Sequence, residues 1–151
     1  MKEAIANTFV FNLIIIFVIV LLAFFIGSLS YSKAFKVKNR IVEEIEKDQG
    51  YTSGTEKNIA DWIRGNGIGY NVNTGNNRVD CPNVQDGKKL PISDYQYCVY
   101  EFNTCSAKTD RAKCGKYYRV VTYMTFDFPI IDQLIKIPVT SETMTFNEID
   151  S

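Results

Sequence analysis

The chain has 151 residues, 46% of them hydrophobic, and its 17 lysines and arginines equal its 17 aspartates and glutamates. This balance gives no global attraction to nucleic acid or to acidic substrates, so we do not expect a nucleic-acid partner. Histidine, the commonest general base and a common zinc ligand, is absent, and we therefore expect neither an enzyme nor a cofactor.

An apolar segment near the N-terminus runs from Phe9 to Leu29 and is interrupted by Asn12, Gly27 and Ser28. Its 21 residues match the roughly 20 that a helix needs to cross the hydrocarbon core of a bilayer. The segment therefore predicts a single-pass membrane protein, with membrane lipid as one of its partners.

A cleaved secretory signal is the alternative for this segment. Ser28 and Ser30 place small residues where a signal peptidase reads, and Lys2 supplies a thin basic region before the apolar run. We favour retention, because the run is long for a signal and the residues after it keep helical order.

Helical periodicity continues beyond the apolar segment. An apolar face is expected from Tyr31, Phe35, Ile41, Val42 and Ile45. Polar residues are expected on the other faces, namely Lys33, Lys36, Asn39, Arg40, Glu43, Glu44 and Lys47. The spacing predicts ion pairs of Arg40 with Glu44 and of Glu43 with Lys47. No proline precedes Gly50, a natural C-terminal cap, so residues 1–50 are predicted to form one membrane-spanning and amphipathic helix of about 40–45 residues.

The apolar half of this helix is also a candidate assembly surface. Helices in lipid associate by close packing and through small and polar residues. We therefore expect self-association, or association with similar subunits. The membrane and assembly positions that we single out are Phe9, Asn12, Phe17, Leu21, Phe24, Gly27 and Ser28.

Two signals disagree on which side of the membrane the rest of the chain lies. Lys33, Lys36, Lys38 and Arg40 follow the span, against Lys2 before it, and the positive-inside rule would put the C-terminal domain in the cytoplasm. Disulfides in that domain would instead imply export. We give the cysteines more weight and expect an extracytoplasmic or cell-surface domain over residues 51–151.

The four cysteines, Cys81, Cys98, Cys105 and Cys114, all lie in this domain. None forms a C-x-x-C pair, so a four-cysteine zinc site would be unusual, and free buried thiols are a further alternative. We favour two disulfides. Four cysteines allow three pairings; our preference is Cys81 with Cys98 and Cys105 with Cys114, because the second pair brackets a Lys/Asp/Ser-rich loop between two strand-like runs.

The first element expected in the domain is a short helix over 54–64, opened by a capping box from Ser53 to Glu56. We expect its Trp62 to pack this helix on a sheet rather than to bind a ligand. Short strands are predicted at 68–72 and 77–81, and longer ones at 95–104, 117–128 and 134–146.

Alternation in the longer strands indicates one shared face for Cys98, Tyr100 and Phe102. Pro138 predicts an edge strand or an irregularity, and a change of register near Ser141 and Glu142 predicts a bulge. The fold class is therefore α+β: a long N-terminal transmembrane and amphipathic helix, a short second helix and a small antiparallel sheet with disulfides.

Two motifs carry candidate chemistry. Ser30 and Lys33 match S-x-x-K, a pattern of serine nucleophiles with a lysine base, but we interpret them as interfacial residues of a continuous helix. A basic contact loop for polyanions is formed by Lys108, Arg111, Lys113, Lys116 and Arg119. Its simpler interpretation, which we favour, is a solvated loop pinned by a disulfide.

The order of these elements resembles that of type IV pilin-like proteins. The run YRVVTYMTFDFPIIDQLIKIPVTSETMTF is similar in layout to TadE-like minor pilins of tight-adherence pili: an alternating strand, a proline turn with apolar residues, and an I-x-V strand leading into a Thr/Ser-rich end. The resemblance implies a structural, membrane-anchored subunit of a bacterial surface filament or secretion-type assembly. The alternative is a monomeric signal-anchored binding module at the cell surface, with the sheet and basic loop as its working surface.

Overall fold

The computed structural model describes residues 2–66, 69–75, 78–91, 94–105, 114–126 and 135–147. Two helices, α1 (Lys2–Lys47) and α2 (Ser53–Gly65), precede an antiparallel sheet of five strands. The strands are β1 (Gly87–Lys89), β2 (Tyr97–Asn103), β3 (Gly115–Phe126), β4 (Ile135–Glu142) and β5 (Phe146–Asn147). Their order is β1-β2-β3-β4, and β5 also pairs with β3. The predicted α+β class is confirmed.

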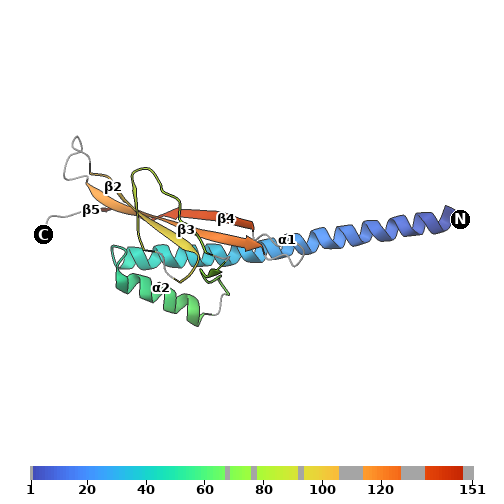
Figure 1. Ribbon diagram of the computed structural model, residues 1–151, viewed down its shortest axis with the longest axis horizontal. Coiled ribbons are helices and arrows are strands. Elements are labelled where there is room, and N and C mark those ends of the chain that lie inside the picture. The colour runs from blue at the N-terminus through green and yellow to red at the C-terminus, as the bar shows by residue number, and fades with distance from the viewer. Residues whose placement is uncertain are drawn as a thin grey trace.

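Helix α1 has two halves with different surroundings. Its C-terminal half lies across one face of the sheet, and its N-terminal half projects away from the domain (Figure 1). The buried stripe of the C-terminal half consists of Ala34, Val37, Ile41 and Ile45, which repeat at helical spacing. They pack with residues of β2 and β3, namely Tyr97, Val99, Tyr118, Val120 and Met124.

The predicted apolar face of α1 was partly wrong. Ile41 and Ile45 are buried, but Tyr31 and Phe35 remain 51% and 40% exposed, with their rings stacked 6.1 Å apart. The face on the sheet is rotated so that it takes up the small Ala34 instead. A small side chain lets the sheet approach the helix closely, which a bulky aromatic side chain at that position would prevent.

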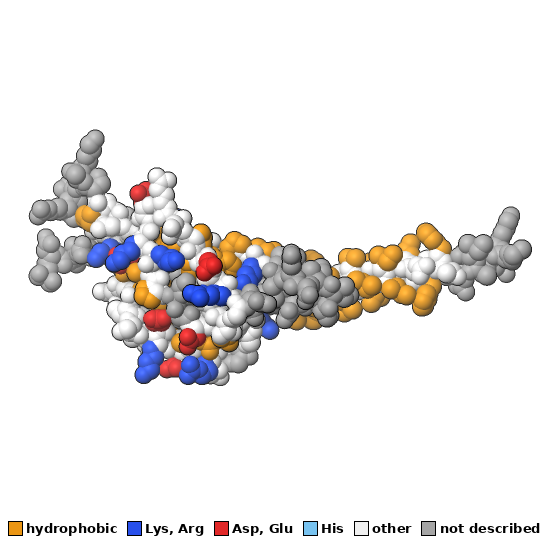
Figure 2. All heavy atoms as spheres, in the orientation of Figure 1, with side chains coloured by type: hydrophobic (Ala, Val, Ile, Leu, Met, Phe, Trp, Pro, Cys, Tyr) orange, Lys and Arg blue, Asp and Glu red, His pale blue; other side chains and the backbone are white. Residues whose placement is uncertain are grey.

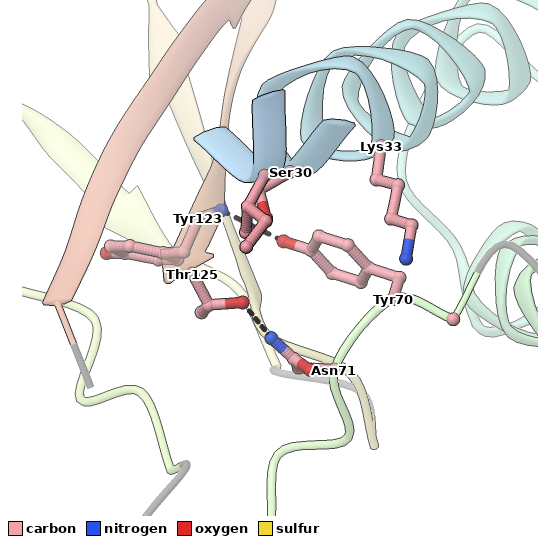
Figure 3. A pocket seen from close by; sticks show the side chains of 8 residues that line it. Ser30, Lys33, Tyr70, Asn71, Tyr123 and Thr125 are labelled. Atoms are coloured by element: carbon pink, nitrogen blue, oxygen red, sulfur yellow. Dashed lines mark hydrogen bonds between the residues drawn. The ribbon is translucent and has the colours of Figure 1, made fainter. Parts of the chain in front are cut away.

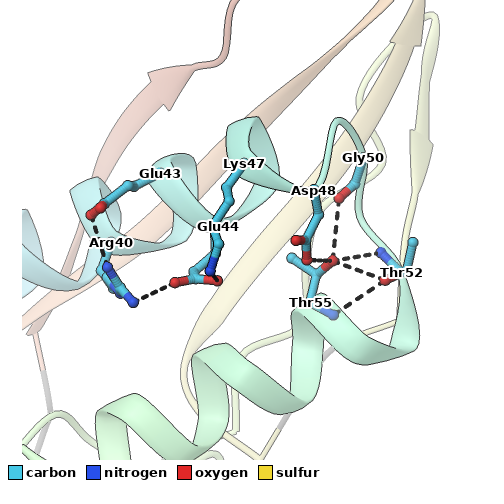
Figure 4. Close-up of polar contacts among 8 residues, drawn as sticks. All are labelled: Arg40, Glu43, Glu44, Lys47, Asp48, Gly50, Thr52 and Thr55. Carbon is cyan, nitrogen blue, oxygen red and sulfur yellow. Dashed lines mark hydrogen bonds and ion pairs between the residues drawn. The ribbon is translucent and has the colours of Figure 1, made fainter.

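A buried carboxylate organises the charges near the end of α1 (Figure 4). The side chain of Glu44, predicted away from the apolar face, is only 3% exposed and pairs with Arg40 as expected. Arg40 also contacts Glu43 at 3.1 Å, while Lys47 lies 3.9 Å from Glu44. The predicted pair of Glu43 with Lys47 is therefore wrong, because both cations converge on the buried carboxylate.

Helix α1 ends in a Schellman motif, but at a different residue from the one predicted. Gln49 takes the left-handed conformation, with φ of 52°, and its N–H donates to the Glu46 carbonyl at 3.4 Å. The N–H of Gly50 donates to the Ile45 carbonyl at 3.0 Å. Gly50 is thus the residue after the left-handed one. It is buried, and a Cβ atom added at this position would lie 3.5 Å from the Tyr118 hydroxyl.

The cap of α2 is also shifted by one residue from the prediction. Thr52, not Ser53, is the N-cap, and its capping-box partner is Thr55 rather than Glu56 (Figure 4). The buried hydroxyl of Thr55 donates to an Asp48 carboxylate oxygen at 2.7 Å. Tertiary contact with the end of α1 therefore selects the cap. From there, Ile59 and Ile63 enter the core beside α1.

The sheet buries side chains on both faces. The face opposite α1 carries Cys98, Tyr100 and Phe102, as predicted, and it is covered by Val79 and Cys81 of an irregular segment. Disulfides join Cys81 to Cys98 and Cys105 to Cys114, with Cα atoms 5.8 and 4.7 Å apart. Our preferred pairing is confirmed, and the zinc and free-thiol alternatives are wrong.

The predictions of the two short strands were wrong. Residues 68–72 form no strand in the described part; Val72 makes an isolated bridge to Tyr95, and residues 78–81 are irregular. Strand β1 was not predicted, because its Gly-Lys-Lys sequence has no apolar alternation. Pro138 does lie in an edge strand, β4.

The predicted strand over 134–146 is interrupted, but slightly later than the predicted bulge. Residues 143–145 leave the ladder, and Thr143 closes the break by donating its N–H to the Tyr118 carbonyl at 2.9 Å. The Thr143 hydroxyl in turn accepts the Tyr118 N–H at 3.0 Å. The chain then returns to β3 as β5.

Candidate functional site

The projecting half of α1 is exposed from Thr8 to Leu22 (Figure 2). The predicted positions Phe9, Asn12, Phe17, Leu21 and Phe24 are all exposed. Within the described residues, α1 is the one helix long and apolar enough to cross a membrane. Apolar side chains that no other part of the chain covers need lipid or another apolar partner.

Gly27 and Ser28, the last two predicted assembly positions, lie on different sides of α1. Ser28 is exposed, whereas Gly27 is half-buried together with Ala23 and Ser30. From Ala23 through Gly27 and Ser30 to Ala34 the spacings are four, three and four residues, so these residues lie on one face of α1. This face continues into the core stripe that begins at Ala34. Gly27 therefore lies on the side of α1 that its own domain occupies.

A second stripe runs along an exposed side of α1. Spacings of four and three place its members above one another. They are Phe17, Leu21, Phe24, Ser28, Tyr31 and Phe35. Phe35 stands six residues beyond Leu29, about 9 Å along the helix at 1.5 Å per residue. The apolar stripe thus extends past the end of the apolar segment, and Lys38 lies 4.3 Å from the centre of the Phe35 ring.

Where the apolar segment ends, a cavity of about 230 Å³ lies between α1 and the sheet (Figure 3). It takes Ile26, Ser30 and Lys33 from α1, Tyr123 and Thr125 from β3, and residues 69–71 from the irregular segment. The two residues of the S-x-x-K match, Ser30 and Lys33, thus line one cavity.

Tyr70 lines the cavity and makes two hydrogen bonds through its hydroxyl. Its hydroxyl accepts the Tyr123 N–H at 2.9 Å and donates to the Gln96 carbonyl. The hydroxyl therefore adds one rung between β2 and β3 just beyond their last direct pair, Tyr97 with Thr122. Burial raises the pKa of Tyr70, so the hydroxyl stays protonated and keeps its donor. Figure 3 shows the ring wedged between α1 and the sheet.

The cavity offers hydrogen-bond donors and a cation. Asn71 donates one amide hydrogen to the Thr125 hydroxyl, which leaves the second amide hydrogen and the Thr125 proton for a ligand. The side chains of Lys33 and Ser30 make no hydrogen bond or ion pair within the described residues. No carboxylate is among the described residues that line the cavity. Its chemistry is that of a site for an anion.

A wider groove lies on another side of Lys33. It has a volume of about 480 Å³ and lies between Trp62 and Asn66 of the α2 end and Leu29, Ser32 and Lys36 of α1. Trp62 is half-buried against the core and lies 5.7 Å from the Arg40 guanidinium. Trp62 therefore packs on the core as expected, but α2 packs on α1 and not on the sheet as predicted. The location of Trp62 beside lysines resembles the aromatic and basic belt at a membrane surface.

Only part of the predicted basic contact loop lies within the described residues. Lys108, Arg111 and Lys113 lie outside the described residues. Arg119 pairs with Glu142 across β3 and β4 at 2.8 Å and stacks on Phe102 at 4.6 Å. Because Arg119 is neutralised in the sheet, it adds little to an anion-binding surface. Lys116 lies in β3 opposite Phe146.

Comparison with family models, with curated proteins and with solved structures found no match to the chain. The class of protein is therefore defined by the structure alone. It is a small α+β domain, stapled by two disulfides, on a long helix able to cross a membrane.

Proposed function

We propose that the chain is a structural, membrane-anchored subunit of a bacterial surface filament or secretion-type assembly, similar to TadE-like minor pilins. The observation that carries the proposal is the exposed stripe on α1 that continues from Phe17 to Phe35. Lipid can cover its first part. Tyr31 and Phe35 extend beyond the apolar segment, and a neighbouring helix of another subunit would cover them.

The domain is proposed to lie outside the cytoplasm. Support comes from the two disulfides, which form and persist in oxidising compartments. The lysines after the span are compatible with this orientation, because long side chains can extend to headgroups on either side. In this topology α1 anchors the subunit in lipid first and then packs against its neighbours.

The assembly surface can be tested on the helix outside the membrane. Changing Phe35→Ser removes an exposed ring without touching the core stripe. Lys36→Ser is the matched control, because Lys36 is the adjacent residue and faces the Trp62 groove. Filaments in cell-surface material would be imaged by electron microscopy, with the chain detected by antibody in the same fraction.

We expect Phe35→Ser to reduce filament incorporation strongly, and Lys36→Ser to leave it unchanged, at equal membrane levels of both variants. Tyr31→Ser should act like Phe35→Ser. Normal incorporation of both aromatic variants would contradict assembly through this stripe. A wild-type chain that stays monomeric in the membrane would favour the alternative, a signal-anchored binding module.

A further inference from the structure

We propose that the cavity at the foot of the domain, lined by Ser30, Lys33, Asn71 and Thr125, binds the phosphate-bearing headgroup of an anionic phospholipid. The inference rests on the membrane anchoring in the proposed function but not on assembly. It adds a specific lipid site to what would otherwise be a general hydrophobic anchor.

The first argument is the height of the cavity along α1. Ile26 belongs to the apolar segment, Leu29 ends that segment, and Ser30 and Lys33 follow it directly. When residues 9–29 cross the hydrocarbon core, the cavity lies at the level of the lipid phosphates. A ligand from the bilayer therefore reaches it without leaving the membrane.

The second argument is charge. Lys33 is the one ionisable side chain of formal charge among the described lining residues. The carboxylates of Glu56, Asp61 and Asp94 line a different hollow, beside α2. A phosphate would supply the counter-ion that Lys33 lacks within the described part of the chain.

The third argument is the arrangement of neutral donors. The Ser30 hydroxyl, the Thr125 hydroxyl and the second Asn71 amide hydrogen are free to donate, whereas the Tyr70 hydroxyl is already used in the β2–β3 rung. Thr125 is held by β3 and Asn71 by its bond to Thr125. A site whose donors are already fixed loses little conformational freedom on binding.

Size and charge together favour an anionic lipid over a zwitterionic one. The cavity of about 230 Å³ compares with about 30 Å³ for one water molecule in the liquid, so it has room for a phosphate and part of its glycerol. A choline or ethanolamine group would bring a second cation close to Lys33. A phosphatidylglycerol-type headgroup, with hydroxyls only, avoids that repulsion.

The test uses the full chain, purified in a neutral non-ionic detergent as dispersed single chains. Lipid retention is measured by native mass spectrometry during titration with phosphatidylglycerol or phosphatidylcholine of the same acyl chains. We expect phosphatidylglycerol to bind with a half-saturation concentration at least about tenfold lower, because hydrogen bonds between charged groups are the stronger ones.

Variants distinguish lipid binding in the cavity from a general attraction of anionic lipid to surface lysines. Lys33→Gln should raise the half-saturation concentration for phosphatidylglycerol about tenfold, and Ser30→Ala by roughly threefold, as expected for a charged and a neutral hydrogen bond. Lys36→Gln is the matched control and should bind like the wild type. Circular dichroism and intact disulfides verify that each variant is folded.

Three results would overturn the proposal. These are unchanged binding in Lys33→Gln, an equal loss in Lys36→Gln, or equal retention of the two lipids by the wild type. In a further arm, glycerol 1-phosphate is added to lipid-free micelles; if it saturates the site as readily as the lipid, the ligand is a soluble phosphate instead. Since single chains are measured, a failure of filament assembly leaves this test unaffected.

Discussion

The Tyr70 hydroxyl links the strands β2 and β3, and the loss of stability on its removal can be predicted. Tyr70→Phe keeps the ring wedged in place but removes the hydroxyl, so the Gln96 carbonyl and the Tyr123 N–H lose their shared partner. The phenylalanine ring itself offers neither group a hydrogen bond. The carbonyl is buried and the N–H is partly buried. At about 1–3 kcal/mol for each unsatisfied group, we expect a loss of about 2–4 kcal/mol in the free energy of unfolding.

The assay is urea unfolding of the full chain in a non-ionic detergent. The single tryptophan, Trp62, packs against the core and reports unfolding of the domain by fluorescence. With a urea dependence of about 1–3 kcal/mol per M for a small domain, the predicted loss lowers the unfolding midpoint by about 1–2 M. The slope of the transition should not change.

Tyr100→Phe is the control for this prediction. Its hydroxyl donates to the Pro82 carbonyl at 2.8 Å, so its removal deprives one group of a partner rather than two. We expect a loss of about 1 kcal/mol for this variant. If Tyr70→Phe were no more destabilising than Tyr100→Phe, the idea that the Tyr70 hydroxyl completes the sheet would be refuted.

Three further predictions concern the same domain. Ile41→Ala should lower the free energy of unfolding by about 2–5 kcal/mol in the urea assay, because Ile41 is fully buried between α1 and the sheet; a loss below 1 kcal/mol would contradict that packing. Replacing Cys81 and Cys98 together by serine should cost about 3 kcal/mol, because their disulfide closes a loop with a sequence separation of 17, and thermal unfolding with and without reductant checks this. Burial raises the pKa of Tyr70 in the folded state above the unfolded-state value of about 10. The free energy of unfolding should therefore be retained below pH 10 and should fall above it by up to about 1.4 kcal/mol per pH unit. Urea midpoints at pH 9 and pH 11 test the sign, and Tyr70→Phe should show a shallower decline.

Local patterns predicted the elements that depend on local chemistry. Helical periodicity and the absence of proline before Gly50 predicted the long helix, and Pro138 predicted an edge strand or an irregularity, of which the structure has the edge strand. The preference for the pair of Cys105 with Cys114 rested on the strand-like runs around it, and the structure contains that disulfide. The alternation of Cys98 and Tyr100 likewise gave the correct face of β2, because side-chain period and burial coincide there.

The features that were missed depend on contacts between distant parts of the chain. The Tyr70 rung joins residues 26 and 53 positions away in sequence, and neither end has a recognisable motif. Thr52 is the cap of α2 because Thr55 reaches Asp48, and that contact needs the fold around it. In α1, hydropathy favoured Tyr31 and Phe35 for the core, whereas steric fit to the sheet selected Ala34.

This error in the apolar face of α1 bears directly on function. Had Tyr31 and Phe35 faced the sheet, they would not extend the exposed apolar stripe beyond the apolar segment, and lipid alone would explain the exposed side chains of that segment. The structure instead gives α1 one side for its own domain, through Gly27, Ser30 and Ala34, and another side that carries Ser28 and the two aromatic rings. Phe35 lies about 9 Å beyond the apolar segment, at the outer side of the headgroup region, where the hydrocarbon core no longer covers an apolar ring. The exposure of the two rings in the single chain is therefore the strongest reason to look for a second chain against them.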